Sequence, residues 1–531
     1  MSSKPLGAFD VAIVGTGLSQ SILAAALSKS GYKVLHLDPN QYYGSYHASL
    51  TLDELVMFSE NYTPQQSSHP RYSEIQYDFP QTSEPSSELS KMSRHFSISL
   101  SPSLIPSKGA MIDSLIGSGV SRYGGFNLLQ GIGMYVEEGE TGYFRPVPAS
   151  KEDIFKDKSM SRVEKLKLMK FLRYIVSDEG KLEPRDEITI KELISGDFGL
   201  PPFMASAVIY ALAFSSSGNE SSAAALSRIQ HYMLSSGRYG NSPFLVGHYG
   251  GLGEVAQGFC RASAVYGGVY ILGRQMESIN FTEKGSPSSR YRICVNDVPD
   301  ILEARTIVFP SSGIASVSSI LSGLKPTVTE QETRLARCIA ILDFQIVFEP
   351  ANQPPADTFT IVFPPHMVGR HEKAVVALVT GEGTLSCPSG YYISYLVTEV
   401  EEDGVNRTAE TILRPYLSSL LSKATTDASR QSPKEPLFEL FYIEMSPTQS
   451  KFQPPPVQGA YLIDDSSPSV ASFTECADHC AREAERVFWE VVKFVESDSG
   501  TETQERIAAP KAFWPISHLG DGSEAEGSEG F

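Results

Sequence analysis

The spacing of apolar residues changes along the chain, and the opening segment predicts an α/β fold. Phe9–Val14 is a short, mostly apolar run rich in residues that favour strands, which is typical of a buried parallel strand. Ser19–Ser30 carries its large apolar residues on one helical face, and Lys33–Leu37 reads as a second strand. This strand–helix–strand order predicts an α/β, Rossmann-type large domain.

Two later segments interrupt this pattern. Residues 59–93 are rich in Ser, Pro, Gln and Glu without a sustained period, so we expect a flexible insertion there. Tyr143–Pro148 contains two prolines, which limit strand pairing and predict a boundary. The first part of the large domain is therefore expected at 1–148.

Helical spacing dominates residues 149–236. Ser161 and Glu164 form the pattern of a capping box at the start of a helix. Phe203–Phe214 follows a pair of prolines and is expected to be helical, as is Ser222–Leu234. We predict a smaller, all-helical domain inserted here.

Strand-like runs return after residue 236 and predict the second part of the large domain at 237–518. The expected strands are Val269–Leu272, Arg292–Val295, Thr306–Phe309, Ile339–Phe348, Thr358–Phe363, Val375–Val379, Tyr391–Val397 and Leu437–Ile443. Helices are expected at Thr408–Leu421 and Glu475–Val495. Residues 519–531 are mostly Gly, Ser and Glu and predict a disordered acidic tail.

Charge and composition exclude some classes of protein. The chain of 531 residues has 44 basic and 62 acidic residues, a net charge of -18, which argues against nucleic-acid binding. No apolar run reaches about 18 residues, so we expect a cytoplasmic protein. Cys476, His479 and Cys480 have metal-like spacing, but no second ligand pair accompanies them, so we predict no metal site.

Gly15, Gly17 and Asp38 form most of a dinucleotide-binding motif between the first two strands. The third glycine is missing, because position 20 is Gln20, whose side chain crowds the helix against the strand. We therefore predict a Rossmann-like scaffold that holds no FAD or NAD. A flavin-dependent oxidoreductase is the alternative from a different class.

Longer blocks of sequence resemble the Rab GDP-dissociation-inhibitor and Rab escort protein superfamily. These blocks are Asp10–Leu18, Lys33–Gly44, Arg238–Leu245 and His248–Gly268. The resemblance implies a flavoprotein-like large domain that uses no flavin, together with a mostly helical second domain.

The same resemblance implies a surface that binds GDP-bound Rab GTPases. The matching positions are Tyr43, Arg238, Tyr239, Glu254, Arg261 and Ile271. Glu254 and Arg261 are seven residues apart, so they share one face of a helix. The simpler interpretation is that they are solvated surface charges.

The resemblance also implies an apolar groove in the helical domain for the geranylgeranyl lipid of a Rab. The candidate residues are Val163, Leu166, Leu168, Met169, Leu172, Met204, Val208, Ile209 and Leu212. A Met and Leu stripe at helical spacing is equally typical of an ordinary bundle core.

Within the superfamily, several features favour an escort protein over an inhibitor. The insertion and the acidic tail lengthen the chain, and Cys260 stands where inhibitors tend to have Ala. An escort protein is non-catalytic. It presents unprenylated Rabs to the αβ heterodimer of Rab geranylgeranyltransferase and delivers the product during transient membrane association. Recycling of prenylated Rabs, the task of an inhibitor, remains the alternative.

Overall fold

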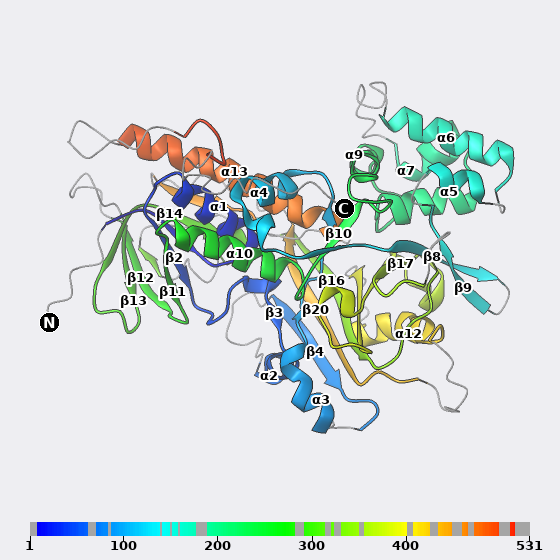
Figure 1. The fold of residues 1–531 in the computed structure, drawn as a ribbon, viewed down its shortest axis with the longest axis horizontal. Coiled ribbons are helices and arrows are strands. Elements are labelled where there is room, and N and C mark those ends of the chain that lie inside the picture. Colours follow the sequence, from blue (N-terminus) through cyan, green and yellow to red (C-terminus); the bar gives the residue numbers. More distant parts are fainter. Residues whose placement is uncertain are drawn as a thin grey trace, which may run out of the picture.

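Figure 1 shows the computed structural model of the chain, in which two β-sheets lie side by side and a group of helices stands at one end. The structure describes residues 8–61, 71–82, 87–138, 141–148, 151–157, 160–176, 188–281, 291–313, 320–322, 331–349, 355–400, 407–424, 434–448, 459–465, 472–498 and 510–515. The tail predicted at 519–531 lies outside these residues.

The first sheet is built around the predicted strand–helix–strand opening. β1 (Phe9–Val14) pairs in parallel with β2 (Val34–Asp38) and with β14 (Leu302–Pro310). The other strands are β11 (Val269–Leu272), β12 (Met276–Phe281), β13 (Tyr291–Val295), β15 (Leu321–Ser322) and β21 (Ala460–Ile463). The order β11-β2-β1-β14-β13-β12-β15, with β21 also beside β14, confirms the predicted α/β fold.

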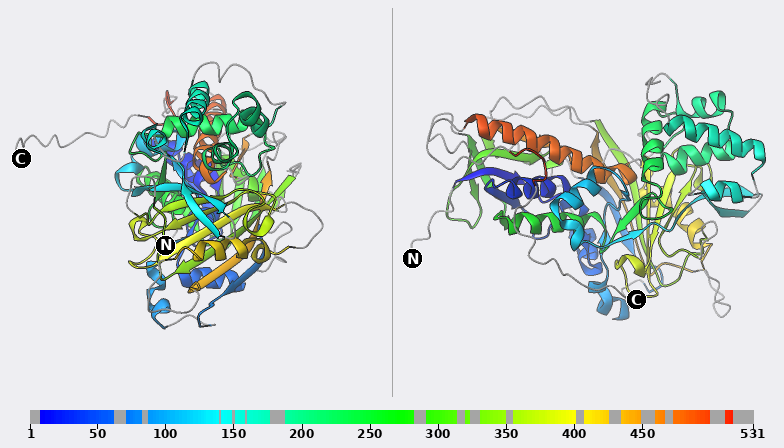
Figure 2. Two further views of the ribbon diagram at one scale, coloured as in Figure 1. Left: turned by 90° about the vertical axis from the view of Figure 1, so that its right-hand side faces the viewer. Right: turned by 45° about the horizontal axis from the view of Figure 1, so that its top comes forward.

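A layer of helices packs on this sheet (Figures 1 and 2). α1 (Leu18–Lys29) contacts both α10 (Leu252–Val265) and α13 (Ser472–Asp498), and α4 (Ala110–Ser118) packs on α13. α1 is buried from its first residue to Ser28 because helices cover it on two sides. The helix predicted in the C-terminal part is confirmed as the centre of α13.

The second sheet runs in the order β4-β20-β16-β19-β18-β17-β8-β9. Its strands are β4 (Tyr72–Asp78), β8 (Gly131–Glu138), β9 (Thr141–Pro146), β16 (Gln331–Leu342), β17 (Phe359–Phe363), β18 (Val375–Thr380), β19 (Tyr392–Val400) and β20 (Phe438–Thr448). α12 (Ala409–Leu421) packs on this sheet and confirms the helix predicted there. The strand predicted at Ile339–Phe348 instead begins at Gln331 and ends at Leu342.

Two predictions for the first part of the chain are wrong. The segment 59–93, expected to be an irregular insertion, contains β4, the end of α2 (Leu52–Asn61) and α3 (Ser87–Met92). Prolines do not stop pairing at Tyr143–Pro148, because β9 pairs with β8. β9 is the last strand of its sheet, and an edge strand tolerates proline.

Helices fill most of the described residues between 151 and 235. They are α5 (Lys151–Lys156), α6 (Arg162–Val176), α7 (Ile190–Glu192), α8 (Pro202–Ser206) and α9 (Ser222–Ser235), with π-helical turns at Leu193–Asp197 and Ala207–Leu212. The predicted capping box before α6 is present, with Ser161 and Glu164 bonded through 2.7 and 3.3 Å contacts. The helix expected at Phe203–Phe214 is split into α8 and a π-helical turn. The domain boundaries remain predictions.

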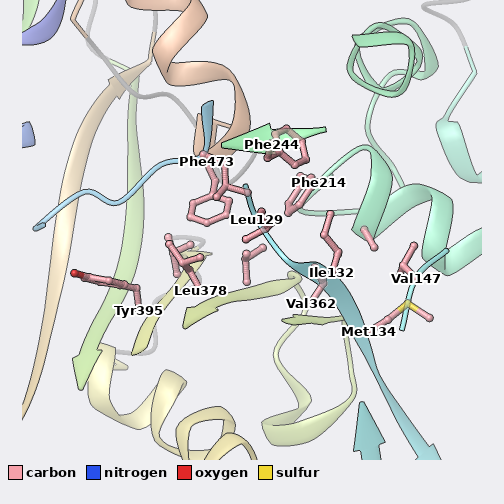
Figure 3. Packing of buried hydrophobic residues seen from close by; sticks show 14 of the residues in the cluster. Leu129, Ile132, Met134, Val147, Phe214, Phe244, Val362, Leu378, Tyr395 and Phe473 are labelled. Carbon is pink, nitrogen blue, oxygen red and sulfur yellow. The ribbon is translucent and has the colours of Figure 1, made fainter. Parts of the chain in front are cut away.

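One apolar core joins these helices to the second sheet (Figure 3). Phe214 from the helical segment meets Phe244, Leu129 and Phe473, and the same cluster continues to Leu378 in β18. Phe244 begins β10 (Phe244–Gly247), which lies between β6 (Ile105–Pro106) and β7 (Phe126–Leu128), while β3 (Ser49–Leu50) pairs with β5 (Ile98–Ser99). Within the described residues, no helix has the length and apolar character to cross a bilayer.

Candidate functional site

The turn between β1 and α1 carries the predicted nucleotide motif, and its polar groups bond to one another. Gly15 has a φ of +85°, which glycine adopts without strain. One oxygen of the buried Asp38 carboxylate accepts hydrogen bonds from Thr16 N and Oγ1 at 2.7 and 2.6 Å. The other accepts one from the backbone N–H of Asn40 at 2.8 Å. Asp38 therefore uses both oxygens to hold the loop.

Gln20 fills the space that a third glycine leaves open in a dinucleotide-binding turn. Its side chain is only 1% exposed, and a Cβ on Gly17 would lie 2.6 Å from its Oε1 atom. In dinucleotide-binding folds the pyrophosphate approaches the helix N-terminus at this turn. The residues present, including the occupied Asp38, do not fit bound FAD or NAD.

The loop after β2 holds Tyr43 next to β11. The Tyr43 ring packs edge-on against Tyr270, with 6.0 Å between the ring centres, and Tyr43 stays partly exposed. Gly44 follows in a left-handed conformation, and a Cβ on it would lie 3.4 Å from Gly253 Cα at the start of α10. This close approach places Tyr43 between the N-terminus of α10 and the strand that carries the partly exposed Ile271.

α10 presents two charged side chains outward. Glu254 and Arg261 are exposed, and desolvation by neighbouring protein atoms raises the pKa of Glu254. The guanidinium of Arg261 lies 5.4 Å from the ring centre of the exposed Tyr123. On the opposite face, Cys260 is buried with its Sγ 3.2 Å from Ser21 Oγ, so it packs against α1. We call Tyr43, Glu254, Arg261 and Ile271 the α10 surface.

Arg238 and Tyr239 lie in the connection between α9 and β10. Both are exposed, and the Arg238 guanidinium lies 5.4 Å from the Tyr239 ring centre. A Cβ on Gly240 would lie 2.5 Å from Leu128, so this loop packs beside β7. The structure gives no contact between this pair and the α10 surface among the described residues.

The nine groove candidates separate into buried and exposed residues. Leu168, Leu172, Met204, Val208, Ile209 and Leu212 belong to the shared core and are at most 9% exposed. Met169 is partly buried, whereas Val163 and Leu166 are 63% and 70% exposed. The buried six form part of a closed core in this structure.

A small cavity lies where α9 meets the start of β8. It has a volume of about 180 Å³, and Tyr232, Leu129, Ile132 and Val147 contribute to its walls. Ligand pockets usually have volumes of about 300–1,000 Å³. A long lipid would therefore require the helices to move away from the sheet.

A buried charge cluster behind β4 was not predicted from the sequence. Glu444 is fully buried and accepts from Arg71 Nη2 at 2.7 Å and from Arg337. Ser101 donates to the same carboxylate at 3.2 Å. These partners hold the pKa of Glu444 at about 2 despite its burial. Arg71 was not predicted to pair with Glu444, because its segment was expected to be irregular.

The structure groups Cys476 and Cys480 with a different histidine from the one that their sequence spacing indicates. His479 Nε2 lies 3.3 Å from Asp464 Oδ2. His47 instead meets Cys476 and Cys480, and the three possible ligand atoms lie within 4.8 Å of one another. The histidine of this group therefore comes from a loop more than 400 positions away in the sequence.

The site therefore combines an α/β scaffold, a nucleotide-type turn filled by Gln20 and a helix that exposes two charged side chains. The chain matches the family model described as GDP dissociation inhibitor over residues 6–417. It therefore belongs to the GDP dissociation inhibitor family, as the sequence resemblance predicted.

Curated relatives agree with this assignment. The chain is 29% identical to a Saccharomyces cerevisiae protein named Rab proteins geranylgeranyltransferase component A, over 78% of this chain and 66% of that protein. It is 28% identical to Rab escort protein 1 of Arabidopsis thaliana, over 80% of this chain and 82% of that protein. The match thus spans slightly less than two thirds of the yeast relative.

Solved structures confirm the fold. Rab GDI from Plasmodium falciparum superposes with a TM-score of 0.64 at 22% identity, covering 92% of this chain and 99% of that one. An oxidoreductase from Methanosarcina mazei superposes with a TM-score of 0.53 at 13% identity, covering 90% and 99%. At these identities the likeness concerns the fold alone, which is shared with oxidoreductases.

Proposed function

We propose that this chain is a Rab escort protein, a non-catalytic subunit that binds GDP-bound, unprenylated Rab GTPases and presents them to Rab geranylgeranyltransferase. The observation that carries the proposal is the α10 surface on a scaffold whose nucleotide turn is filled by Gln20. In this turn Gln20 lies against Gly17, and Asp38 bonds to Thr16 of the same loop, which supports a role that needs no cofactor. The names of the yeast and Arabidopsis relatives favour the same function.

The α10 surface suits a protein partner. An exposed arginine and a partly exposed tyrosine are residue types enriched where proteins meet. The acidic Glu254 on the same helix face adds a second charge that fixes the orientation of a partner. Arg238 and Tyr239 are proposed as a separate contact, because their loop packs beside β7.

The helical segment is proposed to receive the geranylgeranyl lipid, since burial of each CH₂ is worth about 0.8 kcal/mol. The π-helical turn Ala207–Leu212 carries three of the groove candidates, and π-helical turns occur often at functional sites. Binding would open the core between this turn and α6. The proposed place of action is the cytoplasm, with transient delivery of the prenylated Rab to a membrane.

A flavin-dependent oxidoreductase is a poorer explanation, and its test is simple. We expect the purified protein to be colourless and to gain no flavin absorption after incubation with FAD and removal of the excess. The reason is that Gln20 and the occupied Asp38 leave no fitting site. A stoichiometric flavin spectrum would overturn the proposal.

Binding of a Rab tests the proposal directly. A titration of the full chain with an unprenylated Rab should show tighter binding of the GDP form than of the GTP form. Absence of binding to either form would contradict the proposal. A Rab GDP-dissociation inhibitor is the second candidate, favoured by the match to the family model described as GDP dissociation inhibitor. Preference for prenylated over unprenylated Rab would favour it.

A further inference from the structure

We propose that His47, Cys476 and Cys480 bind one Cu⁺ ion between the loop after β2 and α13. These side chains are 1%, 4% and 0% exposed, and their possible ligand atoms lie within 4.8 Å of one another. The proposal does not depend on Rab binding.

The three ligands converge because of simple helix geometry. Cys476 and Cys480 are four residues apart in α13, so their thiols lie one turn apart on the same buried face. His47 reaches this face from the short helical turn Ser45–His47, and its Nε2 atom lies 3.4 Å from Cys476 Sγ. Sulfur and nitrogen ligands of one metal ion have similar separations, since each lies about 2.0–2.3 Å from the metal.

The buried imidazole of His47 makes fewer and weaker hydrogen bonds than a buried polar group usually does. Nε2 contacts only a thiol, which is a weak hydrogen-bonding group, and Nδ1 has no hydrogen-bond partner among the described residues. A buried polar group left without a partner costs about 1–3 kcal/mol. A metal ion at Nε2 would supply the strong interaction that the protein does not.

The ligand set favours Cu⁺ over Zn²⁺. Thiolate and imidazole ligands suit both ions, but structural zinc sites nearly always have four ligands. Only three metal-binding side chains meet here in the described part of the chain, and their burial keeps water from the fourth position. Soft Cu⁺ accepts three ligands.

Binding of Cu⁺ would change the charge and the proton count of the site. Two thiolates with Cu⁺ and a neutral imidazole carry a net charge of one minus, and the two thiol protons pass to solvent on binding. The Arg71 guanidinium stacks 3.6 Å above the ring of Tyr46, the residue before His47. Arg71 and Arg337 share the Glu444 carboxylate, and the buried Asp465 carboxylate also interacts with Arg71, so these side chains balance one another without the metal.

Competition for Cu⁺ tests the site. The full-length reduced protein is titrated anaerobically into Cu⁺ held by a chromophoric chelator. We expect one Cu⁺ per chain to leave the chelator, and Cys476→Ala, Cys480→Ala and His47→Ala each to weaken binding at least tenfold. Cys338→Ala removes a thiol that is equally buried but lies in β16, and it should leave binding unchanged.

Other outcomes overturn the proposal. The first is that the wild type and the Cys476→Ala/Cys480→Ala double variant bind copper equally. The second is that the protein prefers Zn²⁺ when both ions are supplied at equal concentration. The third is that two titratable thiols are lost without metal, which indicates a Cys476–Cys480 disulfide. X-ray absorption of the copper-loaded wild-type protein gives a readout that needs no variant. Two sulfur ligands and one nitrogen ligand are expected, and any spectrum without sulfur contradicts the site.

Discussion

Arg261 is the residue on which the proposed Rab contact depends most. Its side chain leaves the outer face of α10, and its described contact is with the ring of Tyr123. Arginine donates several hydrogen bonds in a fixed plane, which lysine does not reproduce. The residue is therefore free to engage a carboxylate of a partner without loss of core packing.

We predict that Arg261→Ala weakens binding of a GDP-bound Rab about tenfold or more, as expected for an interface arginine. Isothermal titration of both proteins measures the change, and the thermal unfolding midpoint should stay the same. Arg292→Ala is the matched control, because Arg292 is half exposed on β13, away from α10. Equal losses in the two variants would contradict the assignment.

For Glu444 the prediction concerns the stability of the fold and not the binding of a partner. Glu444→Gln removes the charge that two buried guanidinium groups share, so we expect a loss of about 3–5 kcal/mol in the free energy of unfolding at pH 7. Chemical denaturation measures it. Glu74→Gln, which breaks the more exposed pair with Arg334, should cost about 0–1 kcal/mol.

The Glu444 effect should also depend on pH. The folded-state pKa of about 2 lies below the usual 4.5, so the stabilisation is complete above pH 4.5 and is lost as the pH falls toward 2. The difference between wild type and Glu444→Gln should therefore narrow below pH 4.5. A difference that stays constant down to pH 3 would refute this origin.

At the scale of the elements, the helix α12 begins with a side-chain N-cap. Thr408 caps the helix, because its Oγ1 accepts a hydrogen bond from Thr411 N at 3.2 Å. We predict that Thr408→Ala lowers the free energy of unfolding by about 1 kcal/mol. Thr408→Ser keeps the hydroxyl and should restore most of the loss. Equal destabilisation by the two variants would indicate that the methyl group, not the cap, is important.

The elements also show what sequence patterns reveal. The mostly apolar runs Phe9–Val14 and Val375–Val379 were predictable as strands, because both faces of these strands are buried. β4 was not predicted, because the polar residues Ser73, Glu74 and Gln76 interrupt its few apolar residues in the sequence. Its pairing with β20 is a contact between distant segments, which local periodicity does not contain.

The same limit applies to the sites. The residues of the α10 surface were predictable from the family resemblance, since they lie in contiguous blocks of sequence. His47 as the neighbour of Cys476 and Cys480 was not, because only the packing of α13 against the loop after β2 joins them. The sequence also could not show whether the helical segment has a closed core or an open groove, since both have the same spacing of apolar residues.

At the scale of the whole molecule, the α10 surface lies over the first sheet, while the proposed lipid region lies in the helices that share a core with the second sheet (Figure 1). A partner that contacts both would span the two sheets. This separation suits a carrier that holds a folded GTPase at one place and its lipid at another.

Reconstituted prenylation tests the central claim most directly. The assay combines an unprenylated Rab, geranylgeranyl diphosphate and the catalytic αβ transferase, with and without this chain. We predict lipid transfer to the Rab only when the chain is present, and reduced transfer with Arg261→Ala. No transfer in its presence, together with extraction of already prenylated Rab from membranes, would contradict the escort function and assign the chain to the inhibitors.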